Sequence, residues 1–289
     1  MDREGSGRTA LVTGASAGIG AAFARVLAGR GYRLVLTARR ADRLEAVAEE
    51  LRRGHGVDAI TIAEDLSDPA APARLVGELQ RRGLHIDVLV NNAGYGVPGR
   101  FEQPSWQTHA AFLQVMVTAV CELTYRLLPG MIERRWGRII NLASLAGHVP
   151  APAGHTLYAA TKSFLIRFSE ALSAERSHDG IFTTAVCPGF TYSEFHDVTG
   201  TRARVSQLPA FMWMDAATVA EQGYAAVMRG DPVYINGRVN RAIALAARLL
   251  PAGLMRRLVG RSGRRFRSAV GRAIAGRHLY DRGVSRVHL

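Results

Sequence analysis

The sequence has almost no lysine: among 37 Lys and Arg in 289 residues, Lys162 is the only Lys. Cysteine is also scarce, with only Cys121 and Cys187, each inside an apolar segment. Two such thiols do not indicate a disulfide framework. The sequence also contains no Cys and His residues at the spacing of metal ligands, so it does not indicate a metal site. No apolar run approaches the roughly 20 residues of a membrane span. The start, MDREGSGR, contains acids and no apolar core, so it does not resemble a signal peptide, and we expect a cytoplasmic protein.

Acidic residues are nearly missing from the last part of the chain. From Gly237 onward there are 13 Arg and one acid, Asp281, so this part carries +12 of the net charge of +13. The preceding residues carry the remaining +1, which is an ordinary balance. The basic composition of the whole chain therefore does not indicate nucleic-acid binding, and we expect no nucleic-acid partner. We expect one domain over residues 1–236 and a basic extension over 237–289.

The extension has apolar residues at helical spacing between its arginines. Pro251 divides the stretch Arg241–Arg265 into two expected helices. The extension could contact an anionic membrane surface peripherally, pack on the domain or cover a pocket, or remain a solvated basic tail. The composition leaves all three interpretations open.

Glycines follow the first apolar strand. The strand Thr9–Thr13 leads into Gly14, Gly18 and Gly20, and a helical pattern comes next. Gly14 permits a tight turn, Gly18 permits backbone to approach a pyrophosphate, and Gly20 permits the helix to pack closely. This order of strand, glycine loop and helix predicts a dinucleotide-binding unit.

The second strand, Arg33–Thr37, ends in Ala38, Arg39 and Arg40. An acid near this position would bind the ribose hydroxyls of NAD. Arg39 could instead pair with a 2′-phosphate, so the sequence favours NADP(H). The alternative is an exposed arginine in an arginine-rich chain.

Further apolar strands alternate with helical segments along the chain. We expect strands at Asp58–Ala63, Ile86–Val90, Gly137–Ser144 and Ile181–Cys187, and helices at Ala41–Gly54, Pro69–Gly83 and Trp106–Arg135. Each strand is followed by a helix or by a loop that leads to one. The pattern therefore predicts an α/β fold with a doubly wound parallel sheet and helices on both faces.

Tyr158 and Lys162 are four residues apart, so in a helix they lie one turn apart on the same face. A free tyrosine has a pKa of about 10, and a neighbouring cation would lower it by stabilising the phenolate. Lys162 could supply that compact, proton-exchanging charge, which a guanidinium cannot. Ser144, at the end of its strand, could donate a hydrogen bond to a substrate oxygen. The alternative is a helix face with no chemistry.

Four motifs and Ser144 together resemble the short-chain dehydrogenase/reductase family. The motifs are TGASAGIG (Thr13–Gly20), NNAG (Asn91–Gly94), YAATK (Tyr158–Lys162) and CPG (Cys187–Gly189), and the resemblance covers about Thr9 to Ile235. It implies a seven-stranded Rossmann-type sheet in the order 3-2-1-4-5-6-7 and an NADP(H)-dependent carbonyl reductase or alcohol dehydrogenase. It also implies a homodimer or homotetramer that pairs through the long helix and the helix of Tyr158.

The resemblance also assigns roles to residues. Tyr158 would be the acid/base, Lys162 would lower its pKa and bind the nicotinamide ribose, and Ser144 would hold the substrate oxygen. Asp65 would lie at the adenine, and Ser193 stands where the family usually has a threonine that binds the carboxamide. The implied cofactor-binding residues are Gly14, Ser16, Gly18, Ile19, Gly20, Arg39, Asp65, Leu66, Asn91, Ala93, Gly94, Tyr158, Lys162, Pro188, Gly189, Thr191 and Ser193.

One position departs from the family pattern. The family usually has an asparagine in the long helix that helps to hold a water relaying protons to the active-site lysine, and Met116 stands there instead. A thioether cannot donate a hydrogen bond, and Gln114 lies on a different helix face. An NADP(H)-binding regulatory protein with impaired turnover, or an enzyme of the same fold with non-redox chemistry in biosynthesis, therefore stays an alternative.

The expected substrate loop, Phe190–Met214, is rich in aromatic and thioether side chains. With residues before the helix of Tyr158 it predicts an apolar pocket for a bulky or lipophilic carbonyl compound, although ordinary packing would explain part of the set. His148 and His155 flank the site and could touch polar groups of a substrate. The expected pocket residues are Phe190, Tyr192, Phe195, Phe211, Met212, Trp213 and Met214, together with Tyr95, Val149 and Pro150.

Overall fold

The computed structural model describes residues 3–151, 153–154, 156–192, 209–251 and 253–255. A parallel sheet of seven strands forms its centre, in the order β3-β2-β1-β4-β5-β6-β9. Counted along the chain this is 3-2-1-4-5-6-7, the predicted order of a Rossmann-type doubly wound sheet. The strands are β1 (Thr9–Thr13), β2 (Arg33–Ala38), β3 (Ala59–Ala63), β4 (Val88–Asn91), β5 (Gly137–Leu142), β6 (Ile181–Cys187) and β9 (Val233–Ile235).

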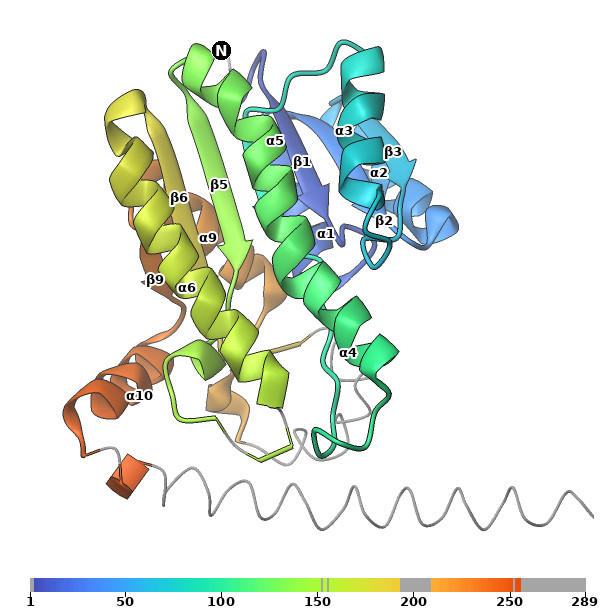
Figure 1. Ribbon diagram of the computed structural model, residues 1–289. Helices are drawn as coiled ribbons and strands as arrows, with labels where there is room; N and C mark the ends of the chain where they lie inside the picture. The colour runs from blue at the N-terminus through green and yellow to red at the C-terminus, as the bar shows by residue number, and fades with distance from the viewer. Residues whose placement is uncertain (1–2, 152, 155, 193–208, 252, 256–289) are drawn as a thin grey trace, which may run out of the picture.

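Helices cover both faces of this sheet (Figure 1). One face packs against α1 (Gly18–Gly29), α2 (Ala41–His55) and α9 (Ala216–Arg229), and the other against α3 (Ala71–Arg81), α5 (Ala119–Glu133) and α6 (Thr156–Arg176). Strand side chains alternate between the two faces. In β1, for example, Ala10 and Val12 join the first cluster and Leu11 joins the second. All five residues of this strand are buried because both of its faces are covered.

All seven strands point in the same direction, so their carboxyl ends meet at one edge of the sheet. The loops after β4 and β5 gather there, together with α4 (Trp106–Leu113) and α10 (Arg238–Leu249) (Figure 1). A small two-stranded ladder lies apart from the main sheet and joins β7 (Phe190–Thr191) to β8 (Trp213–Met214). In a doubly wound sheet, this edge is where ligands bind.

The helix predicted over Trp106–Arg135 is interrupted in the structure. It is divided into α4, a π-helical turn at Gln114–Thr118, and α5. A π turn accommodates one extra residue and often marks a functional site. By length and composition the stretch Trp106–Glu133 could also cross a membrane, but core helices meet the same criterion. Its residues Phe112, Met116, Ala119 and Leu123 are buried, as expected of a core helix.

Two other helix boundaries bear on the predictions. Helix α3 begins at Ala71, with Pro72 in its first turn, so the prediction that Pro69 opens this helix is wrong. Pro72 is tolerated there because the first amides of a helix have no partner within it. Helix α10 ends at Leu249, before Pro251, as the sequence predicted. The extension beyond residue 255 lies outside the described residues.

A chain of buried polar side chains connects the sheet to the helices. The amide nitrogen of Asn91 donates to Thr124 Oγ1 (3.3 Å) and to Asn141 Oδ1 (2.9 Å). Asn141 Nδ2 in turn donates to Ser169 Oγ at 2.9 Å, and this hydroxyl donates to the carbonyl of Leu165. The network joins β4, β5, α5 and α6 in a region without access to water, so its members depend on one another.

We expect Asn141→Leu to lower the free energy of unfolding by about 2–3 kcal/mol, because Asn91 and Ser169 would each lose a buried partner. Urea unfolding measures the change. The matched control is Glu50→Gln at the exposed ion pair with Arg25, which should cost less than about 1 kcal/mol. Equal losses in the two variants would contradict the importance of this network.

Candidate active site

The glycine loop folds tightly at the carboxyl end of β1. Gly14 has φ of +64°, a left-handed conformation that favours glycine, and a Cβ there would lie 2.8 Å from Asn92 Nδ2. A Cβ on Gly20 would overlap the Gly14 carbonyl and the Asn92 side chain. The sequence assigned Gly20 to close packing of the helix on the sheet, and its actual neighbours are the turn itself and Asn92. Helix α1 starts at Gly18 with no side chain capping it, so its first amides remain available to an anion.

Asn92 fixes the loop in this shape. Its amide nitrogen donates to the carbonyls of Thr13 (2.9 Å) and Gly14 (3.2 Å). The Thr13 hydroxyl accepts from the backbone amides of Asn92 and Ala93 at 2.9 and 3.0 Å. These bonds join the ends of β1 and β4 across 79 residues of sequence. They lie at the carboxyl edge of the sheet, where a dinucleotide would bind, and we call this expected binding region the cofactor cleft.

Basic side chains lie beyond this loop, at the end of β2. Arg40 donates through Nη2 to Ser16 Oγ at 3.3 Å, and therefore reaches the glycine loop. Arg39 is exposed and lies near enough to Tyr95 to oppose the rise in pKa that burial causes in that phenol. The sequence pointed to Arg39 alone, and the structure adds Arg40. Both arginines could contact a phosphate at the edge of the cleft.

Asp65 lies on the surface after β3, where its Oδ1 accepts from the amide and hydroxyl of Ser67 at 2.9 and 2.8 Å. Two other residues expected to line the cleft direct their side chains into the protein. Asn91 takes part in the buried network described above, and Leu66 belongs to a hydrophobic cluster. Only their backbone atoms could therefore face a cofactor.

Ser144, Tyr158 and Lys162 come together as predicted. Ser144 follows β5, and its hydroxyl accepts from the Ala146 amide at 3.1 Å and hydrogen-bonds the Tyr158 hydroxyl. Lys162 is 6% exposed, and its Nζ donates to the carbonyl of Leu142 at 2.5 Å. Nζ lies 5.7 Å from the centre of the Tyr158 ring. Tyr158 is partly exposed, whereas the ammonium of Lys162 beside it is buried.

Burial dominates the ionisation of these groups. It lowers the pKa of Lys162 to about 8, against a smaller opposing effect of the Cys187 thiol. It raises the pKa of that thiol to about 12, so Cys187 is neutral at physiological pH. Burial also raises the pKa of Tyr158, and the Ser144 hydrogen bond offsets this only in part. The sequence led us to expect that Lys162 lowers the pKa of Tyr158. The structure instead indicates a raised pKa, because desolvation of the phenolate outweighs the other effects.

The loop after β6 completes the carboxyl edge. The carbonyl of Pro188 accepts from the Leu145 amide at 2.9 Å, and Thr191 Oγ1 donates to the carbonyl of Gly189 at 3.2 Å. A Cβ on Gly189 would lie 2.5 Å from Asn240 Oδ1, so the first turn of α10 packs directly on this loop. The start of the extension is therefore in contact with the domain. Ser193 lies outside the described residues.

Aromatic residues of the expected substrate loop mostly pack on one another. The ring centre of Trp213 lies 5.8 Å from that of Phe190. The Trp213 ring also stacks on the Tyr192 ring, with centres 4.7 Å apart. Tyr192 and Phe211 are nevertheless 53% and 70% exposed, so they remain available to a ligand. Phe195 and His155 lie outside the described residues, and His148 is half-buried with its pKa lowered by burial.

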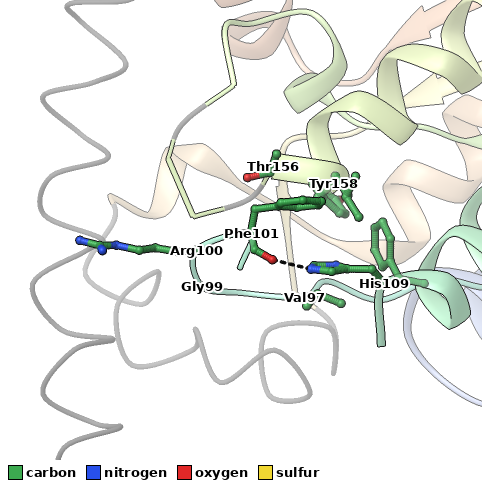
Figure 2. A pocket seen from close by; sticks show the side chains of 9 residues that line it. Val97, Gly99, Arg100, Phe101, His109, Thr156 and Tyr158 are labelled. Atoms are coloured by element: carbon green, nitrogen blue, oxygen red, sulfur yellow. Dashed lines mark hydrogen bonds between the residues drawn. The ribbon is translucent and has the colours of Figure 1, made fainter. Parts of the chain in front are cut away.

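A cavity of about 10 Å³ opens beside Tyr158, enough for roughly one water molecule. Its wall includes His109, a buried residue of α4 that the sequence did not single out. Figure 2 shows His109 and Phe101 beside Tyr158, while the Arg100 side chain points away. The remaining lining residues are Val97, Gly99, Phe112, Thr156 and Leu157.

Comparisons with known proteins identify the family to which this chain belongs. The family model for short chain dehydrogenase matches residues 8–203. The very-long-chain 3-oxoacyl-CoA reductase of Mus musculus is 40% identical over 186 residues, which are 63% of this chain and 59% of that protein. This chain belongs to the short-chain dehydrogenase family. As a member it is an oxidoreductase that uses a nicotinamide cofactor and a small-molecule substrate.

Two solved structures extend the comparison. The short-chain dehydrogenase from Sphingobium yanoikuyae in complex with NADPH is 33% identical to this chain, and the match covers 82% of this chain and 91% of that chain with a TM-score of 0.74. The bulky-bulky ketone specific alcohol dehydrogenase from Comamonas testosteroni is 31% identical, covers 86% and 93%, and has a TM-score of 0.69.

The cleft of this short-chain dehydrogenase fits a dinucleotide. Gly14 and Gly20 leave no room for a side chain, and the uncapped start of α1 suits a pyrophosphate. A Cβ on Gly94 would lie 2.9 Å from Met116 Sδ, so the methionine packs directly beneath the cleft. Met116 is 1% exposed and belongs to the π turn, so this turn brings a buried thioether next to Gly94.

We expect Gly20→Ala to weaken NADPH binding by at least about 10-fold, because the added methyl group would displace Asn92 and distort the loop that faces the pyrophosphate. Titration of NADPH fluorescence measures the change. Gly77→Ala in α3 is the matched control, since a Cβ there meets nothing within 4 Å. Unchanged NADPH affinity in Gly20→Ala would show that the tightness of this loop is unimportant.

Proposed function

We propose that the chain is an NADP(H)-dependent reductase of bulky or lipophilic carbonyl compounds, which also oxidises the corresponding secondary alcohols. The observation that carries this proposal is the arrangement of Ser144, Tyr158 and Lys162. A phenol hydrogen-bonded to a serine faces the cleft, and a buried lysine lies one helical turn away. This combination suits proton transfer to a carbonyl oxygen.

NADP(H) rather than NAD(H) is proposed because two arginines follow β2. Arg40 already reaches Ser16 of the glycine loop, and Arg39 is exposed next to it. A 2′-phosphate would be bound by charge-assisted hydrogen bonds there. The glycine loop would hold the pyrophosphate, the backbone around Ala93 and Gly94 would face the ribose and nicotinamide, and Pro188 and Gly189 would flank the nicotinamide.

The bound nicotinamide would supply the hydride that reaches the carbonyl carbon. Ser144 and Tyr158 would hold the carbonyl oxygen with two hydrogen bonds, and Tyr158 would donate its proton as negative charge develops. The raised pKa of Tyr158 keeps this proton in place until the substrate needs it. The ammonium of Lys162 would then stabilise the phenolate across the 5.7 Å that separates it from the ring centre.

Met116 favours the second candidate, a cofactor-binding protein with impaired or non-redox chemistry. Its side chain cannot provide the amide that the family usually has at this position. A water next to Lys162 would then depend on backbone carbonyls for its hydrogen bonds. We rank this candidate second because Ser144, Tyr158 and Lys162 are all present and placed together.

The proposed substrate class rests on the aromatic side chains near the cleft. Tyr192 and Phe211, in the segment that follows β6, have exposed rings. One similar structure is named for bulky-bulky ketones and one relative for very-long-chain 3-oxoacyl-CoA, and these names support a large apolar carbonyl substrate.

Two contacts with partners are also proposed. Tyr125 on α5 and Phe164 on α6 are 78% and 40% exposed, which supports a homodimer or homotetramer paired through these helices. Helix α10 exposes Leu245 and Leu249 among arginines, which supports a peripheral contact with an anionic membrane surface.

We expect Tyr158→Phe to lower kcat for ketone reduction by about 100- to 10,000-fold, because the variant lacks the proton donor. NADPH binding should change little, since the ring and its packing remain. Oxidation of NADPH, followed at 340 nm against aliphatic, aromatic, β-keto acyl and steroid ketones, measures the effect. Turnover equal to that of the parent protein would remove Tyr158 from the mechanism.

We expect Arg39→Ala and Arg40→Ala each to weaken NADPH binding by about 10- to 100-fold and to leave NADH binding unchanged, because only NADPH carries the 2′-phosphate. Both affinities can be measured by fluorescence titration. Arg53→Ala, an exposed position at the end of α2, is the matched control. Equal losses of NADPH and NADH affinity would mean that neither arginine binds the 2′-phosphate.

A further inference from the structure

Helix α10 presents apolar side chains to solvent. Leu245 and Leu249 lie one turn apart on the same side of the helix and are 57% and 72% exposed, whereas Asn240, on the side that faces the domain, is buried. Leu250 and Leu254, which follow the helix, are exposed as well. None of these leucines belongs to a hydrophobic cluster of the described domain, so the core does not account for them.

The charges around these leucines are all positive. Arg241 precedes the first leucine of the helix by one turn, and Arg248 is adjacent to the second. Residues 237–255 contain three arginines and no acid, and residues 256–289 add ten arginines and one acid. Exposed leucines between arginines are typical of a helix that lies in the interface of an anionic bilayer.

A second copy of the chain suits this surface poorly. Pairing of two α10 helices through their leucines would bring the arginines of both copies together, and no carboxylate in residues 237–255 could neutralise them. Anionic lipid headgroups would neutralise the same arginines, while the acyl chains beneath the headgroups would receive the leucines. Charge complementarity therefore favours a lipid surface as the partner.

The exposed side of α10 is connected to the active site through the β7–β8 ladder. Asn240 donates through Nδ2 to Met214 Sδ at 3.6 Å, and the Met214 carbonyl accepts from the Tyr192 amide at 3.0 Å. Tyr192 and Phe211 expose their rings here. Asn240 also packs on Gly189, in the loop that we expect to flank the nicotinamide. Helix α10, the ladder and this loop are therefore neighbours at the carboxyl edge of the sheet (Figure 1).

We propose that α10 and the β7–β8 ladder dock together on an anionic membrane, and that the cofactor cleft takes its ketone directly from the bilayer. The substrate class is thereby narrowed to ketones whose alkyl chain keeps them dissolved in the membrane. The inference rests on the proposed function, because the ketone would be reduced at Tyr158. The exposed rings of Tyr192 and Phe211 would contact the alkyl chain as it leaves the bilayer, so its apolar surface would stay out of water.

Flotation with lipid vesicles tests the docking surface without turnover. The full chain would be mixed at physiological salt with vesicles of phosphatidylcholine alone or of phosphatidylcholine and phosphatidylglycerol. We expect the full chain to bind the anionic vesicles. The double variant Leu245→Gln and Leu249→Gln should bind them at least about 10-fold less tightly, because it loses the inserted apolar surface and keeps every arginine.

The matched control is the double variant Leu245→Met and Leu249→Met, which stays apolar and should bind like the parent protein. Thermal melts and NADPH titration would verify that each variant folds. Absence of binding by the parent protein, or equal binding by the parent protein and the glutamine variant, would overturn the inference. A change of mass between these two proteins in light scattering without lipid would also overturn it, because the leucines would then join two copies of the chain.

Two ketones with the same reacting group test entry from the bilayer. Acetophenone dissolves in water, whereas octadecanophenone dissolves in the membrane. With NADPH and anionic vesicles, we expect the glutamine variant to reduce octadecanophenone at least about 10-fold more slowly than the parent protein and acetophenone at an unchanged rate. Equal rates of octadecanophenone reduction by the two proteins, or equal losses with both ketones, would overturn entry from the bilayer.

The two assays separate this inference from the proposed function. Vesicle binding that depends on Leu245 and Leu249, with no reduction of any ketone, would contradict the reductase and leave the docking surface standing. Reduction that depends on Tyr158, with equal flotation of the parent protein and the glutamine variant, would contradict the docking surface and leave the reductase standing.

Discussion

The burial of one ammonium group, that of Lys162, is the constraint on which the site depends. Its Nζ donates to the Leu142 carbonyl at the end of β5, and burial lowers its pKa to about 8. Desolvation of this charge costs free energy, which the fold offsets elsewhere. In return, a positive charge held next to a partly exposed phenol can stabilise a phenolate as it forms. The arginine-rich chain keeps its only lysine here, and the pKa of a lysine shifts more readily on burial than that of an arginine.

The surrounding structure holds the Lys162 ammonium in position relative to the cofactor cleft. Asn92 and Thr13 bind the ends of β1 and β4 together, so the glycine loop and the loop after β4 form a single rigid edge. The buried network from Asn91 to Ser169 extends the same connection to α6, the helix that carries Tyr158 and Lys162. Cofactor cleft and proton donor are thus linked through hydrogen bonds rather than through flexible loops.

Three features were predictable from the sequence: the strand order, the glycine loop and the arrangement of Ser144, Tyr158 and Lys162. Each depends on local sequence patterns and on motifs whose order and spacing are typical of one fold. Alternation along β4 could also have assigned Asn91 to the interior, since it follows Leu89 by two residues and shares its face. The π turn at Met116 adds a residue without changing composition, so hydrophobic periodicity does not reveal it. The sequence did not single out His109, because its hydrogen bond with the Phe101 carbonyl forms only when the loop after β4 folds beside α4.

The single lysine allows the central claim to be measured directly. In the untagged chain, labelling of lysine with ¹³C at Cε gives one NMR signal, and its chemical shift can be followed from pH 6 to pH 11. The account predicts one titration with a pKa of about 8, well below the ordinary value of 10.5. A pKa near 10.5 would contradict it, because the ammonium would then be solvated and Tyr158 would have no buried charge beside it.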